Sequence, residues 1–221
     1  MRGKLRCKGK SLLTFPTDFT VVDLETTGMN ARSCSILEVA CVKYRGGAEV
    51  GKFTTLVKPE GNGRVPRCIT ELTGITTEMV ADAPSFASIA EETWNFLEGE
   101  LIVGHNVNFD VDFLYDAFET ILGRKLQNDF VDTYRIARRV LPDLEHRRLV
   151  DLCDHFGIQT IHHRALADCD STRQVLEKLR QTAEERGIDV AGPIRRKYSR
   201  DGSAYCLACW PPVGLTRVED L

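Results

Sequence analysis

Four acidic residues and one histidine could together cut a phosphodiester bond. Asp23 and Glu25 lie in a run of β-branched and apolar residues, Asp110 follows a Gly-His-Asn stretch, and His163 precedes Asp168 by five positions. Carboxylates supply the hard oxygen ligands that Mg²⁺ and similar ions prefer, and an imidazole can take a proton from an attacking water. The set predicts a two-metal hydrolytic centre, provided that the fold brings the five side chains together.

Asp23 and Glu25 are two positions apart in an expected strand, so their side chains point to the same face. They would lie roughly 6.5–7 Å apart along the strand. Two buried carboxylates repel each other and lose their hydration, and a divalent cation relieves both costs. The alternative is an edge strand with a polar face, which the hydrophobic flanks of this segment disfavour.

Helical periodicity selects Asp110 from the acids near it. Asp110 aligns with Leu114 and Phe118 at spacings of four and eight residues, so we expect it to face the core. Asp112 and Asp116 share another face, which we expect to be solvated. The first turn of a helix favours an anion even without a function, so the inward orientation is the stronger argument.

The same test selects Asp168 over Asp170, because Asp168 aligns with apolar positions such as Leu179 while Asp170 aligns with charged ones. His163 would lie just ahead of this helix, where it could act as the base that activates water. His162 is adjacent, and the sequence alone does not decide between the two histidines.

The segments that must position these residues alternate between strand and helix patterns. Strands are expected over 19–24, 36–44, 52–57, 101–103 and 130–131, the first three as an antiparallel meander. Helices are expected around 69–72, 77–80, 85–97, 109–122, 133–141, 148–156 and 165–186. Ser85 and Asn108 are the expected N-caps, and Gly157 and Gly187 the expected stops. The pattern indicates an α/β protein.

Composition bounds the class of protein. A chain of 221 residues, with 43% hydrophobic and 28% charged residues, is typical of one α/β domain in water. No apolar run approaches the length that crosses a bilayer, and the apolar stretch at 11–15 is too short for a signal peptide. Most of the eight cysteines are scattered, which disfavours a disulfide framework. We therefore expect a cytoplasmic protein without a membrane segment.

Charge divides the chain into three parts. Residues 1–18 carry five Lys or Arg against one Asp, and residues 192–221 carry five against three acids, so a total of −3 leaves −9 for the middle. We expect a basic N-terminal extension over 1–18, one catalytic domain over 19–191 and a basic tail over 192–221. An acidic body suits a short nucleic-acid end held through metals, although each basic tail could simply be solvated.

The basic tail holds Cys206 and Cys209 in a Cys-x-x-Cys spacing. One such pair is half of a zinc site, and it could also serve redox chemistry. The third interpretation, incidental packing or a loose tail, is the one that we favour.

Three motifs resemble those of the DEDDh branch of the DnaQ-like 3′→5′ exonuclease superfamily, whose best-known member is the proofreading epsilon subunit of bacterial DNA polymerase III. They are Asp-Leu-Glu-Thr-Thr-Gly at 23–28, Gly-His-Asn-x-x-Phe-Asp at 104–110 and His-x-x-x-x-Asp at 163–168. Leu-Thr-Gly-Ile-Thr at 72–76 is also similar to the family pattern. The resemblance covers about 19–183 and is specific as a combined set.

The resemblance implies a ribonuclease H-like fold, with a five-stranded mixed sheet flanked by helices. It implies that Asp23, Glu25 and Asp168 bind one Mg²⁺ or Mn²⁺ ion. Asp23 would also bind a second ion, which Asp110 would reach through water, and His163 would be the general base.

The resemblance also implies a substrate. Leu24, Thr26 and Thr27 would hold the 3′-terminal nucleotide of a single strand, with a weaker contribution from Phe109. The expected activity is 3′→5′ release of nucleoside monophosphates from DNA, and a separate DNA polymerase would be the partner if the protein proofreads. The alternatives are a ribonuclease similar to RNase T or oligoribonuclease, and a non-catalytic binding module; the complete ligand set disfavours the module.

Overall fold

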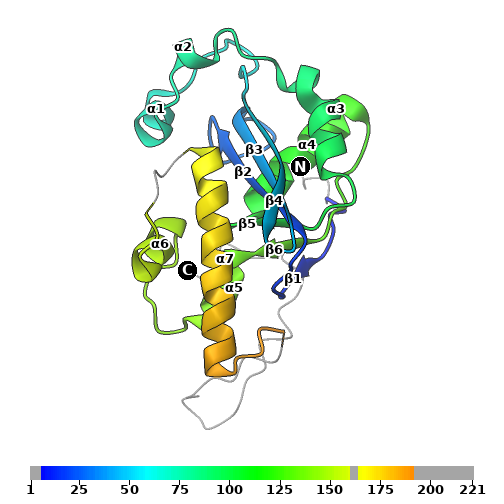
Figure 1. Ribbon diagram of the computed structural model, residues 1–221. Coiled ribbons are helices and arrows are strands. Elements are labelled where there is room, and N and C mark those ends of the chain that lie inside the picture. The colour runs from blue at the N-terminus through cyan, green and yellow to red at the C-terminus, as the bar shows by residue number, and fades with distance from the viewer. Residues whose placement is uncertain (1–5, 160–163, 192–221) are drawn as a thin grey trace, which may run out of the picture.

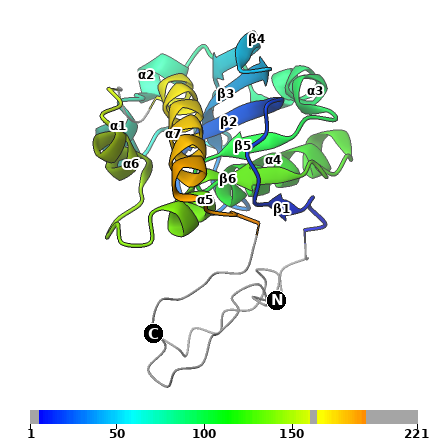
Figure 2. The same cartoon turned by 60° about the horizontal axis from the view of Figure 1, so that its bottom comes forward.

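The computed structural model describes residues 6–159 and 164–191. Within these residues a six-stranded mixed sheet has the strand order β1-β6-β5-β2-β3-β4, and helices cover both faces (Figures 1 and 2). The strands are Ser11–Leu12 (β1), Phe19–Thr26 (β2), Ile36–Arg45 (β3), Ala48–Leu56 (β4), Ile102–Gly104 (β5) and Phe130–Asp132 (β6). The fold class is confirmed, but the sheet has one strand more than the five expected.

The additional strand comes from the N-terminal extension. Ser11 and Leu12 pair in parallel with Phe130 and Val131 of β6. A strand of two residues is too short to give a periodic signal, so only its pairing partner reveals it. The extension is therefore tied to the sheet, at least over these two residues.

Strand β2 occupies the middle of the sheet. It pairs antiparallel with β3, and β3 pairs antiparallel with β4, which confirms the expected meander. On its other side β2 pairs in parallel with β5, which in turn pairs in parallel with β6. A central strand has both edges paired and is covered on both faces, so polar side chains on it are costly without a function.

The two faces of the sheet bury two separate cores, because successive side chains of β2 alternate between them. On one face Val21 packs with residues of α5 (Thr133–Val140), α6 (Leu149–Phe156) and α7 (Ala165–Arg186). On the other face Val22 and Leu24 pack with residues of α3 (Phe86–Leu97) and α4 (Asn108–Leu122). Figure 2 shows the sheet between these two helical layers.

Two short helices lie beyond one end of the sheet (Figure 1). They are α1 (Arg67–Thr73) and α2 (Thr77–Val80). A third, smaller cluster of Leu37, Val65, Ile75 and Val80 holds them in place. This segment contains the Leu-Thr-Gly-Ile-Thr motif.

Helix starts test the capping expectations. Ser85 is the N-cap of α3 as expected, and its hydroxyl accepts from the Ser88 N–H. Asn108 was expected to cap α4, but the helix begins one residue earlier, with Val107 at the N-cap position. The Asn108 side chain instead accepts a hydrogen bond from Lys8. Helices α6 and α7 end at Gly157 and Gly187, as expected.

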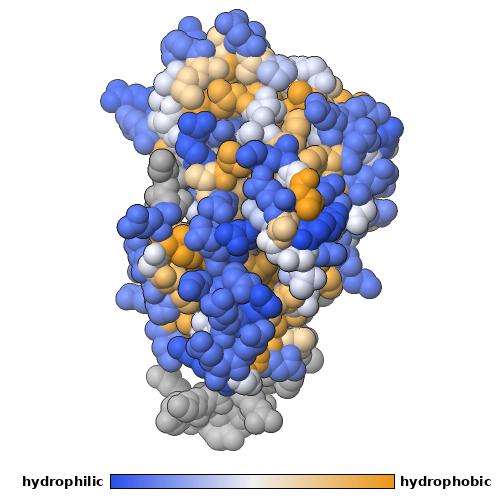
Figure 3. Space-filling view, viewed as in Figure 1, coloured by the Kyte–Doolittle hydropathy of each residue, from blue (hydrophilic) through white to orange (hydrophobic). Residues whose placement is uncertain are grey.

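In the part of the chain that the structure describes, no helix combines the length and the apolar character that crossing a membrane requires. Figure 3 shows mostly hydrophilic residues over the outward side of α7.

Candidate metal centre

Two of the expected acids leave the same face of β2. Asp23 and Glu25 are half-buried, whereas Leu24 between them points into the opposite core. Burial raises the pKa of Asp23 well above its ordinary value, and the charges of Asp110 and Asp168 raise it further. Burial also raises the pKa of Glu25 to about 7, with further contributions from Asp168 and Glu38, while Arg164 opposes the rise. The pair is therefore poorly accommodated as two bare anions at neutral pH.

Helix α7 brings the third acid to this pair. Asp168 lies in its first turn and is buried, as its periodicity predicted. One carboxylate oxygen from each of Asp23, Glu25 and Asp168 lies within 4.8 Å of the others. Three hard oxygen donors at this spacing suit a divalent ion such as Mg²⁺ or Mn²⁺, which would also compensate their mutual repulsion. The donor set thus fits the expected metal.

Asp110 approaches from the other helical layer. It is buried in the first turn of α4, and its Oδ1 accepts a hydrogen bond of 3.0 Å from the Leu24 N–H. It does not belong to the group of three, but it contributes to the raised pKa of Asp23. Burial raises the pKa of Asp110 too, although the N–H bonds it accepts oppose that rise. The four carboxylates thus meet at the end of β2.

A fifth acid, Glu38, supports the site and was not among the expected residues. It lies on β3 directly opposite Glu25 and is almost fully buried. Its carboxylate accepts from the Ala165 N–H at 3.2 Å and from the Arg164 guanidinium at 3.1 Å. Glu38 therefore fixes the first residue of α7, the helix that carries Asp168. A charged residue inside the apolar run of β3 is the sequence signal that could have identified it.

A sixth acid, Asp132, fixes the turn that leads into α4. Its Oδ1 accepts from the N–H of Asn106 at 2.9 Å and from the N–H of Tyr134 at 3.0 Å. Asn106 has a φ of 58°, a left-handed conformation that non-glycine residues rarely adopt. At Gly104, in the same turn, a Cβ would lie 2.6 Å from a Val107 methyl carbon. This turn is tightly constrained, and it sets the direction in which α4 presents Asp110.

The histidine of the second motif has a structural role. The Nδ1 atom of His105 is 2.9 Å from the Thr133 hydroxyl, and burial lowers the pKa of His105 to about 4. The ring therefore stays neutral near pH 7. His162 and His163 lie outside the described residues, so His163 as the base stays a prediction.

The expected substrate residues surround the turn after β2. The Leu24 N–H is engaged by Asp110, and the Thr26 hydroxyl donates to the Gly28 carbonyl. The Thr27 hydroxyl accepts from the Ser35 N–H at 2.8 Å, which leaves its own proton available to donate. The ring centroid of Phe109 lies 4.8 Å from that of Phe113, and the two rings are tilted by 50°. Both rings line a hollow of about 190 Å³, together with Arg6, Met29, Asn30, Ala31 and Asp112.

A family model described as "Exonuclease" (RNase_T) matches residues 20–176. This chain belongs to that exonuclease family. The exonuclease chain is 33% identical over 162 residues to the DNA polymerase III subunit epsilon of Aquifex aeolicus. The matched region covers 73% of this chain and 79% of the relative. It is 39% identical over 171 residues to the PolC-type DNA polymerase III of Oceanobacillus iheyensis. The resemblance to the DnaQ-like superfamily is confirmed.

Coverage differs sharply between these relatives. The match to the PolC-type polymerase spans 77% of this exonuclease chain but only 12% of that protein. Among solved structures, Exonuclease X in complex with 5′ overhanging duplex DNA has a TM-score of 0.59 and 27% identity over 78% of this chain and 99% of that one. Exonuclease I of E. coli, in complex with a dA16 oligonucleotide, has a TM-score of 0.66 over 79% of this chain and 42% of the Exonuclease I chain. Because the sequence identity is only 21%, this similarity supports the fold alone.

Proposed function

We propose that this chain is a metal-dependent 3′→5′ exonuclease that releases nucleoside monophosphates from the 3′ end of single-stranded DNA. The convergence of Asp23, Glu25 and Asp168 within 4.8 Å, in a chain of the exonuclease family, is the observation that carries the proposal. Similarity to the polymerase III subunit epsilon supports DNA as the substrate and a separate polymerase as a partner.

Each acid has a distinct part in this proposal. Asp23, Glu25 and Asp168 would hold one Mg²⁺ or Mn²⁺ ion, and Asp110 would join Asp23 at a second. Bound divalent ions supply Lewis-acid stabilisation of the phosphate and lower the pKa of bound water. His163, placed by sequence just ahead of α7, would take the proton from the attacking water at a ring nitrogen.

Residues at the end of β2, in the turn after it and in α4 would hold the terminal nucleotide. The Thr27 hydroxyl has a proton to donate to a sugar or phosphate oxygen. The paired rings of Phe109 and Phe113 offer an aromatic surface against which a base can stack, and Met29, which is 81% exposed, extends that surface. Stacking of this kind accepts any base, so it suits an enzyme that shortens a strand regardless of sequence.

The test is time-resolved digestion of 5′-labelled single-stranded DNA and of matched RNA in Mn²⁺. Asp23→Ala is the blank, and Asp170→Ala is the matched control, because Asp170 is an exposed acid on α7 beside Asp168. A descending ladder on DNA with wild type and Asp170→Ala, absent with Asp23→Ala, is the expected result. A ladder on RNA alone would assign the protein to the exoribonucleases, and no ladder on either substrate would favour a binding module.

A further inference from the structure

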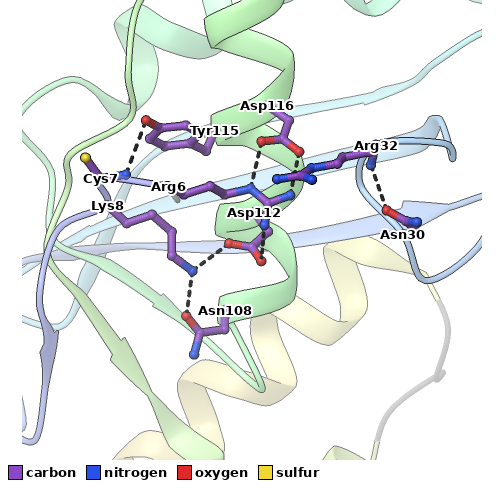
Figure 4. A network of polar contacts seen from close by, with 9 residues as sticks. All are labelled: Arg6, Cys7, Lys8, Asn30, Arg32, Asn108, Asp112, Tyr115 and Asp116. Carbon is purple, nitrogen blue, oxygen red and sulfur yellow. Dashed lines mark hydrogen bonds and ion pairs between the residues drawn. The ribbon is translucent and has the colours of Figure 1, made fainter. Parts of the chain in front are cut away.

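Residues 6–12, here called the basic arm, lead from the outer face of helix α4 to strand β1. Figure 4 shows Arg6, Cys7 and Lys8 beside α4. The arm belongs to the basic N-terminal extension expected over 1–18, for which a solvated tail was one of the alternatives. Its Arg6 and Lys8 instead reach the outer face of α4, where Asp112 and Asp116 point toward them. These two acids lie on the outer face of α4 as expected, but they are partly buried and ion-paired with Arg6 and Lys8 rather than fully solvated. Their partners lie about a hundred residues away in sequence, beyond the reach of helical periodicity.

The Lys8 side chain is bonded to the turn of α4 that carries Asp110. Its Nζ donates to Asn108 Oδ1 at 2.9 Å and to Asp112 Oδ1 at 2.6 Å. Asn108 and Asp112 are four residues apart and share one face of the helix. Asp110 lies between them in sequence, about 200° around the helix from each, and so faces inward. One ammonium group therefore holds the outer side of the turn whose inner side carries the catalytic acid.

Arg6 extends this grip by one helical turn. Its guanidinium binds Asp116 through two hydrogen bonds, of 2.7 and 2.5 Å, and Asp112 through a third of 3.0 Å. The side chains of Arg6 and Lys8 are only 21% and 20% exposed. Partly buried, bidentate and networked pairs hold geometry better than isolated surface pairs.

The other end of the arm is anchored to the sheet. The Lys10 carbonyl accepts from the Phe130 N–H at 2.9 Å, and the Lys10 N–H donates to Asp129 Oδ1 at 2.6 Å. At Gly9 a Cβ would lie 2.1 Å from the Asn128 carbonyl oxygen, so only glycine permits this approach. The arm thus connects α4 to strand β6, which ends at Asp132, the residue that fixes the turn before α4.

We propose that Arg6 and Lys8 are positioning residues, which set the place of Asp110 in the metal centre by bracing the outer face of α4. This inference rests on the proposed exonuclease function. It predicts that loss of the brace impairs binding of the second metal ion and the chemical step more than it impairs binding of DNA.

Lys10 provides a matched control within the arm. Among the described residues, its ammonium group makes no ion pair or hydrogen bond, although its backbone belongs to the same arm. Lys10→Met and Lys8→Met therefore remove the same charge from nearly the same place, and only Lys8→Met removes the grip on α4. A general attraction of DNA by basic residues would be weakened equally by both variants.

The experiment compares kcat, KM and the Mn²⁺ concentration for half-maximal activity in wild type, Lys8→Met, Lys8→Arg and Lys10→Met. The melting temperature of each protein, with and without Mn²⁺, is measured alongside. Lys8→Met should lower kcat about tenfold, which is less than the roughly 10²-fold that a 1 Å misplacement can cost. It should also raise the Mn²⁺ concentration for half-maximal activity and leave KM similar. Lys8→Arg should recover most of the loss, and Lys10→Met should match wild type. If Lys8→Met does not fold, Asn108→Ala removes one of the two acceptors of Lys8 from the α4 side. It should also lower kcat and raise the Mn²⁺ midpoint at similar KM, by less than Lys8→Met.

Equal losses in Lys8→Met and Lys10→Met would overturn the inference, as would a fall in melting temperature at unchanged kcat and Mn²⁺ midpoint. Wild type is compared with Asp23→Ala in the same assay. An inactive wild type would refute the proposed function itself, whereas an active wild type with an unaffected Lys8→Met refutes only the role of the arm.

Discussion

Helices α4 and α7 each present an inward aspartate from the first turn, but they are held in opposite ways. The start of α7 is held from inside the sheet by Glu38, a buried carboxylate on the neighbouring strand. The outer face of α4 is held by the basic arm, through ion pairs that water can reach. The comparison teaches that two equivalent ligands can depend on very different environments. Asp168 is positioned by the core, and Asp110 in part by the surface.

The largest expected effect comes from replacing the metal ligands Asp168 and Asp110 themselves. We expect the ion held by the three carboxylates of Asp23, Glu25 and Asp168 to bind more tightly than the second ion. Asp168→Asn should abolish this tighter Mn²⁺ site. It should also reduce kcat by more than about 10–100-fold, which is the cost of losing a ligand's supporting partner. Asp110→Asn should leave that tighter site, because Asp110 is outside the group of three carboxylates. Titration calorimetry with Mn²⁺ measures both sites. Retention of the tighter site in Asp168→Asn would contradict the assignment.

A smaller loss should follow from Glu38→Gln. The amide oxygen can still accept from the Ala165 N–H, but the charge that attracts Arg164 is gone. We expect a loss of about 10–100-fold in kcat, with little change in KM, because the start of α7 is displaced. Steady-state kinetics, with Glu49→Gln on exposed β4 as the control, checks this. A Glu38→Gln enzyme that differs only in melting temperature would show that Glu38 merely stabilises the fold.

Stability without metal should depend on pH through Glu25. Its pKa rises to about 7 from an ordinary value of 4.5, so between these values the folded protein binds more protons than the unfolded chain. The free energy of unfolding should therefore fall as pH rises from about 5 to 8, by about 1.4 kcal/mol for each unit of the shift, at most. Each kcal/mol corresponds to about 2–4 °C in melting temperature.

Thermal unfolding in EDTA at pH 5 and pH 8 measures this fall. Saturating Mn²⁺ should stabilise the protein more at pH 8 than at pH 5, because ligand carboxylates must be deprotonated to bind the ion. Glu25→Gln should flatten the pH dependence in EDTA. If the metal-free protein were instead more stable at pH 8 than at pH 5, the carboxylates could not be a cluster whose members repel one another.

The smallest effect should distinguish the two helix starts directly. Salt should screen the partly buried ion pairs of Lys8 and Arg6 more than the buried hydrogen bond between Glu38 and the Ala165 N–H. Raising NaCl should therefore speed amide hydrogen exchange in the first turn of α4, by an amount corresponding to about 0.2–1 kcal/mol, and leave that of α7 unchanged. Mass-spectrometric exchange measures both turns. In Lys8→Met the salt effect on α4 should become smaller, because only the ion pairs of Arg6 remain. An equal salt effect on both helices would remove the distinction.

The sequence predicted most of this arrangement where the signal is local. Periodicity placed Asp110 and Asp168 inward, and alternation placed Asp23 and Glu25 on one face of β2. It did not identify Glu38, because the register that sets Glu38 opposite Glu25 is a property of strand pairing.

Contacts between distant segments account for the other differences. Asp112 is partly buried and ion-paired because Lys8 reaches it, and strand β1 is defined only by its pairing with β6. Asn108 missed its expected capping role because Lys8 engages its side chain. Each of these depends on where the N-terminal residues return to the fold, which no local pattern encodes.

Strand β1 has a further consequence for handling the protein. It covers the outer edge of β6, and the Ser11 hydroxyl is held there by Arg135. A shortened chain that began at Phe19 would uncover the unpaired N–H and C=O groups of β6, which can template association with another chain. Such a truncated protein would be expected to self-associate and aggregate, even though its motifs were complete.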